Sequence, residues 1–331
     1  MGAIKFSVGM PPGPQVVEYA QLAQDLGYDR IWLYDSAALY QDVWVWLARI
    51  ADRTDINIGT AVLVPNLRHV MTTASAIATI EHLAPGRLAC GFGTGATARW
   101  VLGKPALTWA ATRRYIEQLR GLLAGEVVEV DGAKTQMIHY DDLAPARPIR
   151  TPLILSAIGP KGKQIAHEVA DGIMTIGGGV DDMDWHIQMT SGTVLDDGED
   201  LESPRVKDAL GPWFTVAYHG AWQSSLPQAG GAAVDNLPLG AEWRAALEAE
   251  RPEGERHLAA HEGHVSHVTA RDRKLVDQAG PLISMMGWAG TAAQIREKAE
   301  AAIAAGATEL LYTPAGPDVP REMRAWAAAL T

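Results

Sequence analysis

The residues from Leu88 to Ala96, LACGFGTGA, place three glycines in alternation directly after a short apolar run. They fit the G-x-G-x-x-G/A pattern of a dinucleotide-binding turn, which normally follows the first strand of its unit and precedes an acid at the next strand end by about 20 residues. Here the apolar run is the fourth expected strand, and the next acid, Glu117, falls in an expected helix. We therefore reject a Rossmann dehydrogenase. The glycines are expected in a loop after a strand, where they serve either a flat ligand or only a tight turn.

A strand-end acid and a lysine-bearing helix start are further candidates for chemistry. Asp35 follows the apolar run RIWLY, so it leaves the end of an expected strand. Gly159 and Pro160 open an expected helix, with Lys161 and Lys163 in its first turn. Free backbone N–H groups and the positive end of the helix dipole make such a start an anion site, and the lysines add charge to it. The alternative is a solvated lysine pair on an ordinary loop.

Four histidines recur at helical spacing in RHLAAHEGHVSH, and histidines four residues apart can bind zinc. The H-E-x-x-H order of a zinc helix is missing, Gly263 interrupts the helix, and the segment lies in an expected insertion. We therefore predict no metal site and place these side chains on a solvated face or beside the substrate pocket. They are His257, His261, His264 and His267.

Length, charge and cysteine content narrow the class of protein. A chain of 331 residues with 47% hydrophobic content can bury a large core. Its formal net charge of -11 argues against a nucleic acid or an anionic membrane as partner, because both need a basic face. The one cysteine, Cys90, lies in an apolar run, as a buried thiol in a reducing compartment would. No apolar run approaches the roughly 18 residues of a membrane span, and no signal peptide is recognisable. We expect a cytoplasmic protein that acts on a small molecule.

Strand-like and helix-like segments alternate along the chain. Continuous apolar runs predict eight strands, at 4–9, 30–34, 56–64, 87–91, 152–157, 172–176, 213–218 and 309–313. Apolar residues at helical spacing predict helices at 16–26, 43–51, 70–83, 113–123, 163–170, from about 181, at 291–305 and at the end of the chain. A polar hairpin is expected at 126–140, with its turn at Asp131 and Gly132.

Hydrophobic strands separated by helices predict a parallel sheet with helices on its faces. Eight such units over the whole length favour an α/β fold of the (β/α)8 TIM barrel type over an open doubly wound sheet. No linker divides the chain, so residues 1–331 are expected to form one domain with insertions at about 126–150 and 221–281. The second insertion is expected to be mostly helical and to cover the pocket.

Five strand ends carry a family resemblance. In order they read LYDS, GTAVLVPNLRH, GRLACGFGTG, LSAIGPKGKQIAHEVADG and IMTIGG, and the match returns in the closing GTAAQIREKAEAAIAAGATELLYTPAGPD. In this order the chain resembles the luciferase-like flavin and deazaflavin oxidoreductases, a family of (β/α)8 barrels that includes bacterial luciferase. The stretch DSAALYQDVWVWLARIADRT is most similar to the methylenetetrahydromethanopterin-reductase branch, whose members use coenzyme F420, a deazaflavin.

The resemblance implies where the cofactor binds. Asp35 would lie beside the deazaflavin ring, and a non-proline cis peptide between Ala61 and Val62 would lie against it, with Val64 close by. Thr94 and Gly95 would hydrogen-bond the cofactor. Its phosphate would be received by the expected helix start and the neighbouring strand end, at Ile158, Gly159, Pro160, Lys161, Gly162, Ile176, Gly177 and Gly178.

Proton transfer has no obvious agent in this sequence. The sugar-phosphate dehydrogenase branch carries histidine directly after the strand-end acid and glutamate directly after GTG. This chain has Ser36 and Ala96 there, which argues against sugar oxidation. The catalytic candidates are Asp35, Ser36 and Tyr40. Eleven tryptophans predict an apolar pocket for a bulky, planar or hydrophobic substrate, and its lining candidates are Trp44, His69, Trp288 and Tyr312.

These features predict an oxidoreductase that transfers hydride between coenzyme F420 and an organic substrate. A first alternative keeps the fold and uses FMN, as a two-component monooxygenase served by a partner flavin reductase. The two cofactors differ because a deazaflavin has carbon where a flavin has N5, so it passes hydrides and does not activate oxygen. A second alternative is a non-catalytic cofactor-binding protein of the same fold. The family commonly pairs through helices beside strands two and three, so we expect a homodimer.

Overall fold

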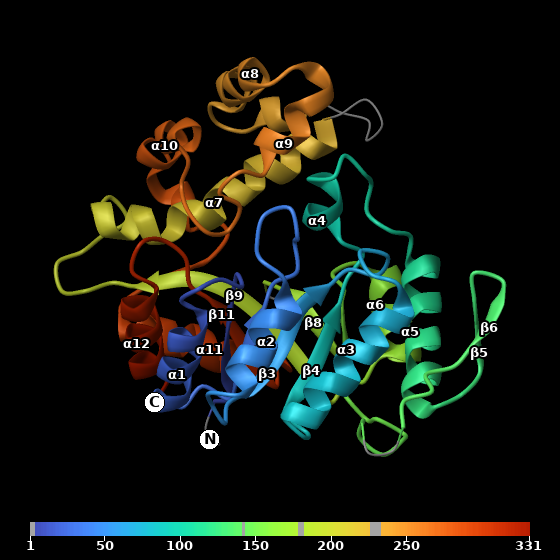
Figure 1. The fold of residues 1–331 in the computed structure, drawn as a ribbon. Helices are drawn as coiled ribbons and strands as arrows, with labels where there is room; N and C mark the ends of the chain where they lie inside the picture. Colours follow the sequence, from blue (N-terminus) through green and yellow to red (C-terminus); the bar gives the residue numbers. More distant parts are fainter. Residues whose placement is uncertain (1–3, 141–142, 178–181, 226–232) are drawn as a thin grey trace.

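Eight parallel strands close into a barrel in the computed structural model, which describes residues 4–140, 143–177, 182–225 and 233–331. The strands follow one another in the order β1, β2, β3, β4, β7, β8, β9 and β11, and β11 pairs with β1 to close the ring (Figure 1). The expected TIM barrel is thus confirmed. Its strands are β1 (Phe6–Met10), β2 (Arg30–Leu33), β3 (Asn57–Leu63), β4 (Leu88–Phe92), β7 (Leu153–Ser156), β8 (Gly172–Ile176), β9 (His186–Val194) and β11 (Glu309–Thr313).

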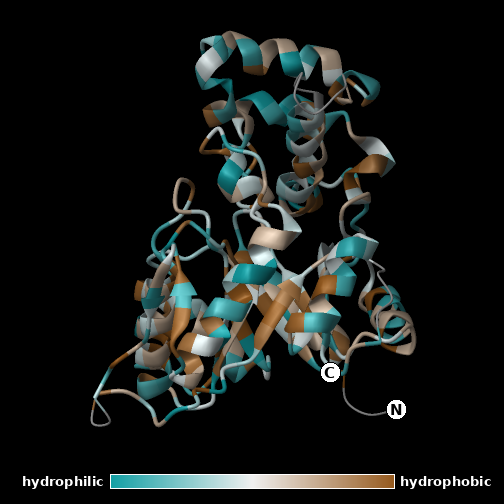
Figure 2. Cartoon of the chain, turned by 90° about the vertical axis from the view of Figure 1, so that its right-hand side faces the viewer, coloured by the Kyte–Doolittle hydropathy of each residue, from teal (hydrophilic) through white to brown (hydrophobic). Residues whose placement is uncertain are grey.

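The strands are buried because helices cover their outer faces and side chains fill the barrel. Trp32, Met174 and Leu311 belong to the cluster inside the barrel, and Figure 2 shows the strands as mostly hydrophobic. The indole of Trp32 finds polar partners within this interior, since its Nε1 lies 3.1 Å from both Ser7 Oγ and Glu309 Oε1. A larger apolar core lies between the strands and the surrounding helices. This arrangement is the one expected of continuous apolar runs in parallel strands.

Helices surround the barrel at the positions in the chain where they were expected, to within a few residues. Capping side chains mark several of their starts: Asp42 accepts the N–H groups of Trp44 and Val45, and Thr291 forms a capping box with Gln294. The helices are α1 (Val16–Asp25), α2 (Val43–Ala51), α3 (Val70–Leu83), α5 (Trp109–Ala124), α6 (Pro160–Val169), α11 (Ala292–Ala304) and α12 (Val319–Leu330). A short helix, α4 (Ala96–Trp100), follows the glycine-rich loop.

The predicted hairpin is also confirmed. Strands β5 (Val128–Val130) and β6 (Ala133–Thr135) pair antiparallel. Both turn residues, Asp131 and Gly132, have positive φ, at 50° and 80°. That is the conformation a two-residue hairpin turn requires.

Residues 204–225 and 233–284, here called the helical insertion, form a layer over the barrel with a core of their own (Figure 1). Its longest helix, α7 (Pro204–Ser225), crosses the barrel opening. A short strand, β10 (Trp288–Gly290), then pairs with β9 and leads the chain back to the barrel. The other elements of the insertion are η1 (Val234–Asn236), α8 (Gly240–Glu250), η2 (Glu253–Glu255), α9 (Arg256–Ala260), α10 (Ala270–Asp277) and η3 (Gly280–Ser284).

Two predicted elements were wrong. Residues 213–218, expected as a strand, lie inside α7, so the insertion begins before residue 221. A row of apolar residues four apart continues through this helix and is buried in the second core: Val206, Leu210, Phe214, Tyr218 and Trp222. The helix expected from about 181 is strand β9, whose start lies at His186. Its buried polar side chains, among them Gln188 and Thr193, hid the strand, because the prediction looked for apolar runs.

Among the described residues, no helix is both long and apolar enough to cross a membrane.

Candidate functional site

An arginine joins two carboxylates at the carboxyl edge of the barrel, the edge at which the parallel strands end. Asp35 follows β2 and is buried, and its Oδ2 accepts a hydrogen bond from Arg68 Nη1 at 2.7 Å. Arg68 follows β3, and its Nη2 donates to Asp42 Oδ2 at 2.8 Å. One guanidinium thus holds the loops after two neighbouring strands together. The sequence prediction gave Arg68 no role, although a lone cation at a strand end beside a strand-end acid was a usable signal.

The pKa values of the two carboxyl groups shift in opposite directions. Burial raises the pKa of Asp35 above its usual value, against the opposing hydrogen bond and charge of Arg68. Burial also acts to raise the pKa of Asp42, but Arg68 and the first N–H groups of α2 outweigh it, and the net pKa is lowered. Ser36, the neighbouring catalytic candidate, is buried, and its carbonyl accepts the backbone N–H groups of Leu39 and Tyr40. Asp35 is therefore the member of the bridge that holds its proton to a higher pH.

The ends of β3 and β4 pack so closely that the glycine pattern has a structural cause. A Cβ on Gly91 would lie 2.4 Å from the carbonyl oxygen of Thr60, and one on Gly95 would lie 2.2 Å from Val64 Cγ1. Gly95 also has a positive φ of 77°. The peptide bond between Ala61 and Val62 is cis, as the resemblance implied. These glycines are explained by contact between two strand ends, so they are no independent sign of a ligand.

A helix start with free donors lies at the ends of β7 and β8. Gly159 caps α6 without a side-chain bond, and Pro160 has no N–H. The backbone N–H groups of Lys161 and Gly162 have no partner among the described residues, and Lys161 is exposed. Gly162 is needed here because a Cβ would lie 2.4 Å from Trp109 Cζ2. Free N–H groups at a helix N-terminus are the donors with which such helix starts bind anions.

Apolar side chains flank this helix start. Ile158 is 65% exposed and Ile176 is 39% exposed, at the ends of β7 and β8. Gly177 follows with a φ of 55°, whereas Gly178, the last predicted phosphate contact, lies outside the described residues. Two exposed isoleucines beside free N–H groups suit a ligand with both an apolar and an anionic part.

A cavity of about 310 Å³ begins at the same strand end and runs under the helical insertion. Trp288, a predicted pocket residue, lies in its wall opposite Trp213 of α7. Methionines supply much of the remaining apolar surface, and such side chains adapt to flat or irregular ligands. The lining residues are Ile176, Gly177, Met189, Thr190, Ser191, Trp213, Met285, Met286, Gly287 and Trp288. A second cavity, of about 560 Å³, lies over the loops after β1, β2 and β11 and includes Tyr40.

Three predicted pocket residues have other positions. Tyr312 is fully buried and stacks on Trp326 with ring centroids 4.0 Å apart, so it belongs to the core. Trp44 packs its ring against the barrel core from α2. His69 caps α3, where its Nδ1 accepts the N–H of Met71 at 3.2 Å. Aromatic type and a place near a strand or helix end did not distinguish a core or capping role from a pocket role.

Tyr40 links the barrel to the helical insertion. Its hydroxyl donates to the carbonyl oxygen of His264 at 2.5 Å, and burial raises its pKa far above the ordinary value. Thr97 of α4 makes a second link, because its Oγ1 lies 3.2 Å from His264 Nε2. Tyr40 was predicted as a catalytic residue, and its hydroxyl proton is committed to this carbonyl in the structure.

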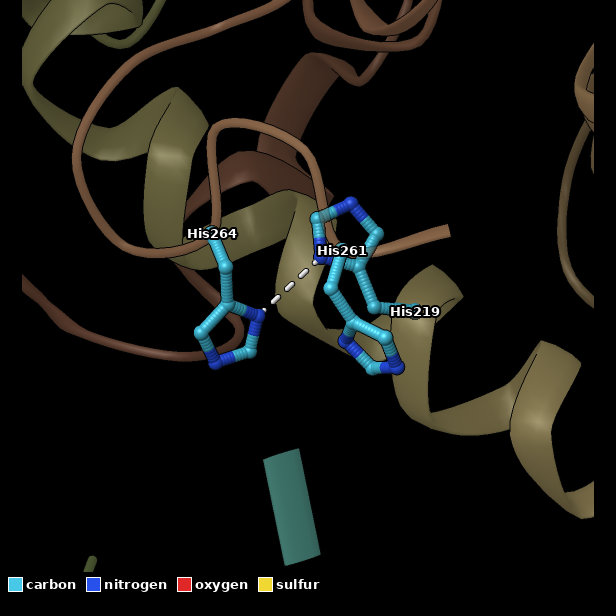
Figure 3. A group of neighbouring side chains, drawn as sticks. All are labelled: His219, His261 and His264. Atoms are coloured by element: carbon cyan, nitrogen blue, oxygen red, sulfur yellow. Dashed lines mark hydrogen bonds between the residues drawn. The ribbon is translucent and has the colours of Figure 1, made fainter. Parts of the chain in front are cut away.

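Two of the four histidines of RHLAAHEGHVSH meet a third one from α7. His261 and His264 lie beside His219, with their ring nitrogens within 4.8 Å of one another, whereas His257 and His267 are outside this group (Figure 3). Burial, followed by the charge of His219, lowers the pKa of His261 to about 3 and that of His264 well below its usual value. His219 was missed because it follows directly on the segment expected to be a strand.

The family model of luciferase-like monooxygenases matches residues 6–309. The 5,10-methylenetetrahydromethanopterin reductase of Methanolobus tindarius is 32% identical over 169 residues, which cover 49% of this chain and 50% of the relative. The F420-dependent glucose-6-phosphate dehydrogenase of Beutenbergia cavernae is 32% identical over 180 residues, covering 49% of this chain and 52% of the relative. The chain thus matches about half the length of these curated relatives.

Solved structures agree with the fold over the whole chain. The coenzyme F420-dependent tetrahydromethanopterin reductase from Methanopyrus kandleri superposes with a TM-score of 0.66 at 18% identity, covering 99% of this chain and 98% of that one. An F420-dependent secondary alcohol dehydrogenase in complex with an F420-acetone adduct also gives 0.66 at 18% identity, with 99% and 100% covered. The monooxygenase RslO1 from Streptomyces bottropensis gives 0.62 at 16% identity, with 99% and 98% covered. With the match over residues 6–309, the barrel places this chain in the luciferase-like monooxygenase family.

Proposed function

We propose that this protein is an oxidoreductase that transfers hydride between coenzyme F420 and a hydrophobic or planar organic substrate. The observation that carries the proposal is the α6 start, where the free N–H groups of Lys161 and Gly162 lie between the exposed Ile158 and Ile176. Curated relatives named as F420-dependent glucose-6-phosphate dehydrogenases support the choice of cofactor. When bound, coenzyme F420 supplies the deazaflavin ring that gives or accepts the hydride.

The residues at the barrel edge fit such a ligand in two respects. The N–H groups of Lys161 and Gly162, with the Lys161 ammonium, would hold its phosphate, because a helix start favours negative charge. Ile158 and Ile176 offer apolar surface next to it, as a flat aromatic ring requires. The neighbouring cavity with Trp213 and Trp288 in its wall would receive the substrate on the side of the ring that the insertion covers.

Asp35 is the group we assign to proton transfer. It is buried at the end of β2, and its raised pKa lets its carboxyl hold or release a proton nearer to neutral pH than an exposed aspartate. Three other predicted site residues are engaged elsewhere: Tyr40 donates to a carbonyl, His69 caps a helix and Tyr312 lies in the core. Arg68 fixes the carboxylate through its 2.7 Å hydrogen bond and so serves as a positioning residue.

Replacing the anion-binding lysine tests the site. Lys161→Ala should weaken F420 binding about fivefold to tenfold, since an exposed charge at a helix start contributes about 1 kcal/mol. Lys134→Ala is the matched control, because Lys134 is an exposed lysine on the β5–β6 hairpin. Fluorescence titration of F420 into both variants measures the effect. Equal affinities for the wild type and both variants would remove the α6 start from the cofactor site.

A turnover assay tests the activity itself. Reduced F420 is mixed with a panel of apolar alkenes, imines and ketones without oxygen, and the return of the F420 absorbance is followed. Oxidation that depends on both protein and substrate supports hydride transfer. Oxygen-dependent product formation with reduced FMN instead would identify a monooxygenase. F420 binding without turnover of any panel member would favour a non-catalytic binding protein.

A further inference from the structure

Three histidines converge between α7 and the segment that follows α9. His219 lies in α7, and His261 and His264 follow α9 in the loop before α10 (Figure 3). One ring nitrogen from each lies within 4.8 Å of the others, and His219 Nδ1 is 3.2 Å from His264 Nδ1. Two nitrogen ligands of a tetrahedral metal ion, each about 2.0–2.1 Å from it, lie about 3.3 Å apart. The observed spacing therefore matches two ligands of one metal ion.

His261 supplies the strongest sign of a missing ligand. Its side chain is 0% exposed, and within the described part of the chain neither its Nδ1 nor its Nε2 has a hydrogen-bond partner. Trp100 stacks on its ring with centroids 5.7 Å apart, and His219 and His264 approach it edge-on at 5.7 Å and 5.5 Å. Buried polar atoms are normally paired, so an unpaired imidazole turned toward two others needs an explanation.

The outer nitrogens of the other two rings face polar groups. His219 Nε2 lies 3.8 Å from Asp272 Oδ2, a carboxylate that is also buried. His264 Nε2 lies 3.2 Å from the hydroxyl of Thr97. Histidines that bind a metal through one nitrogen typically donate the other N–H to a carboxylate or another oxygen acceptor. Both rings thus have their inner nitrogens toward each other and an oxygen behind the outer nitrogen.

We propose that His219, His261 and His264 bind one divalent transition-metal ion of the zinc type, with a water molecule as the fourth ligand. Neutral imidazole nitrogens are suitable ligands for such an ion. The site would join α7 to the loop carrying His261 and His264, and through Thr97 it would also hold that loop against α4 of the barrel. It lies in the helical insertion, and its existence does not depend on the proposed cofactor.

Separated ligands explain why the sequence argued against a metal. The first ligand precedes the second by more than forty positions in the chain, so no compact motif such as H-E-x-x-H arises. Only the fold of α7 over the loop before α10 brings the three rings together.

Metal binding to the full-length protein tests the proposal directly. Protein stripped with a chelator is titrated with Co²⁺ alone, and the visible absorption of four-coordinate Co²⁺ is followed. We expect about one equivalent to bind with these bands, Zn²⁺ to displace it, and added Zn²⁺ to raise the temperature of unfolding. Failure of the wild-type protein to bind Co²⁺ or Zn²⁺ would overturn the proposal without recourse to any variant.

Histidine variants locate the site. His261→Ala removes a ring that makes no hydrogen bond to any described residue, and it should weaken Co²⁺ binding by at least about 100-fold. His264→Gln is a second ligand variant in case the first fails to fold, as judged by circular dichroism. His257→Ala and His267→Ala are matched controls from the same segment and should bind like the wild type. Unchanged Co²⁺ affinity in folded His261→Ala and His264→Gln protein would place the metal elsewhere and contradict the proposal.

Discussion

The barrel edge and the helical insertion bury polar side chains in different ways. At the edge, Asp35 is held by Arg68, and the same guanidinium also holds Asp42. In the insertion, His261 is as deeply buried, but its ring nitrogens have no hydrogen-bond partner among the residues that the structure describes. A paired carboxylate is positioned by the protein alone, whereas an unpaired imidazole is complete only with a ligand. This contrast supports the two proposals: a cofactor and substrate site at the barrel edge, and a separate metal ion in the insertion.

The two regions also differ in how their cores are made. The barrel core consists largely of aliphatic residues between strands and helices, while the insertion core is rich in aromatic rings, among them Phe214, Tyr218 and Trp243. The two regions also contact each other, through polar links such as Tyr40 with the carbonyl oxygen of His264 and Arg205 with Glu322, and through an apolar cluster that joins Tyr34 to Trp213 and Val265. Because each region nevertheless has a core of its own, we expect a cavity in one core to destabilise that region first.

The largest effect is expected at the barrel edge. Asp35→Asn removes the proposed proton carrier and should lower turnover with F420 by about 10²–10⁴-fold, with little change in F420 affinity. Asp42→Asn is the matched control, since Asp42 binds the same arginine but has a lowered pKa. Steady-state kinetics of both variants provide the measurement. Full activity in Asp35→Asn would show that the bridge has only a structural role.

The next largest effect is expected on stability, from a cavity in the insertion core. Phe214→Ala deletes a fully buried ring and should reduce the free energy of unfolding of the insertion by about 3–5 kcal/mol. Leu47→Ala makes a comparable cavity in the barrel core and should cost about 2–5 kcal/mol there. Urea unfolding with hydrogen exchange by region compares the two. If Phe214→Ala exposed barrel amides as much as insertion amides, the two regions would be one cooperative unit.

A single hydroxyl tests the link between the regions. Tyr40→Phe removes the hydrogen bond to the carbonyl oxygen of His264 and should cost about 0.5–1.5 kcal/mol. Tyr34→Phe is the control, because the hydroxyl of Tyr34 bonds to Gly9 within the barrel at 3.0 Å. Hydrogen exchange of residues 261–267 should quicken in Tyr40→Phe only. Equal exchange in the two variants would mean that this bond does not hold the insertion.

The smallest effect concerns the loss of protein stability at low pH, through an ion pair at the start of the insertion. A hydrogen bond from Arg205 of α7 lowers the pKa of Glu199 to about 2. A carboxyl with a lowered folded-state pKa stabilises the fold above its unfolded value, near 4.5, and this contribution is lost as the pH falls toward 2. The pair is partly exposed, so we expect less than about 1 kcal/mol. Glu199→Gln should flatten the fall in unfolding temperature between pH 5 and pH 2, within roughly that limit. An unchanged slope would show that Glu199 contributes nothing.

The barrel and the insertion also differ in how well their elements could be predicted from sequence. Parallel strands are buried on both faces, so apolar runs located seven of the eight barrel strands and the helices between them. Strand β9 was missed because Thr193 and His186 are buried with polar partners, Glu322 and Thr175. In the insertion, β-branched and aromatic residues at 213–218 suggested a strand, but their packing every fourth residue against the second core makes them helical.

Site residues could be predicted where their signal is local in the sequence, and were missed where their role depends on a distant partner. Asp35 was predictable because it directly follows a recognised strand. The α6 start was predictable because glycine, proline and lysine open a recognised helix. Arg68, Thr97 and His219 were missed because their roles depend on partners that are distant in sequence: Asp35, His264 and His261. Tyr312 was misassigned since its type suits both a pocket wall and a core, and only burial separates the two.

The most direct test of the proposed function is a paired fluorescence titration of the purified apoprotein with coenzyme F420 and with FMN in the same buffer and salt. We predict micromolar or tighter binding of F420 and much weaker binding of FMN. The opposite preference would contradict the hydride-transfer account and make an FMN-dependent monooxygenase the function to pursue.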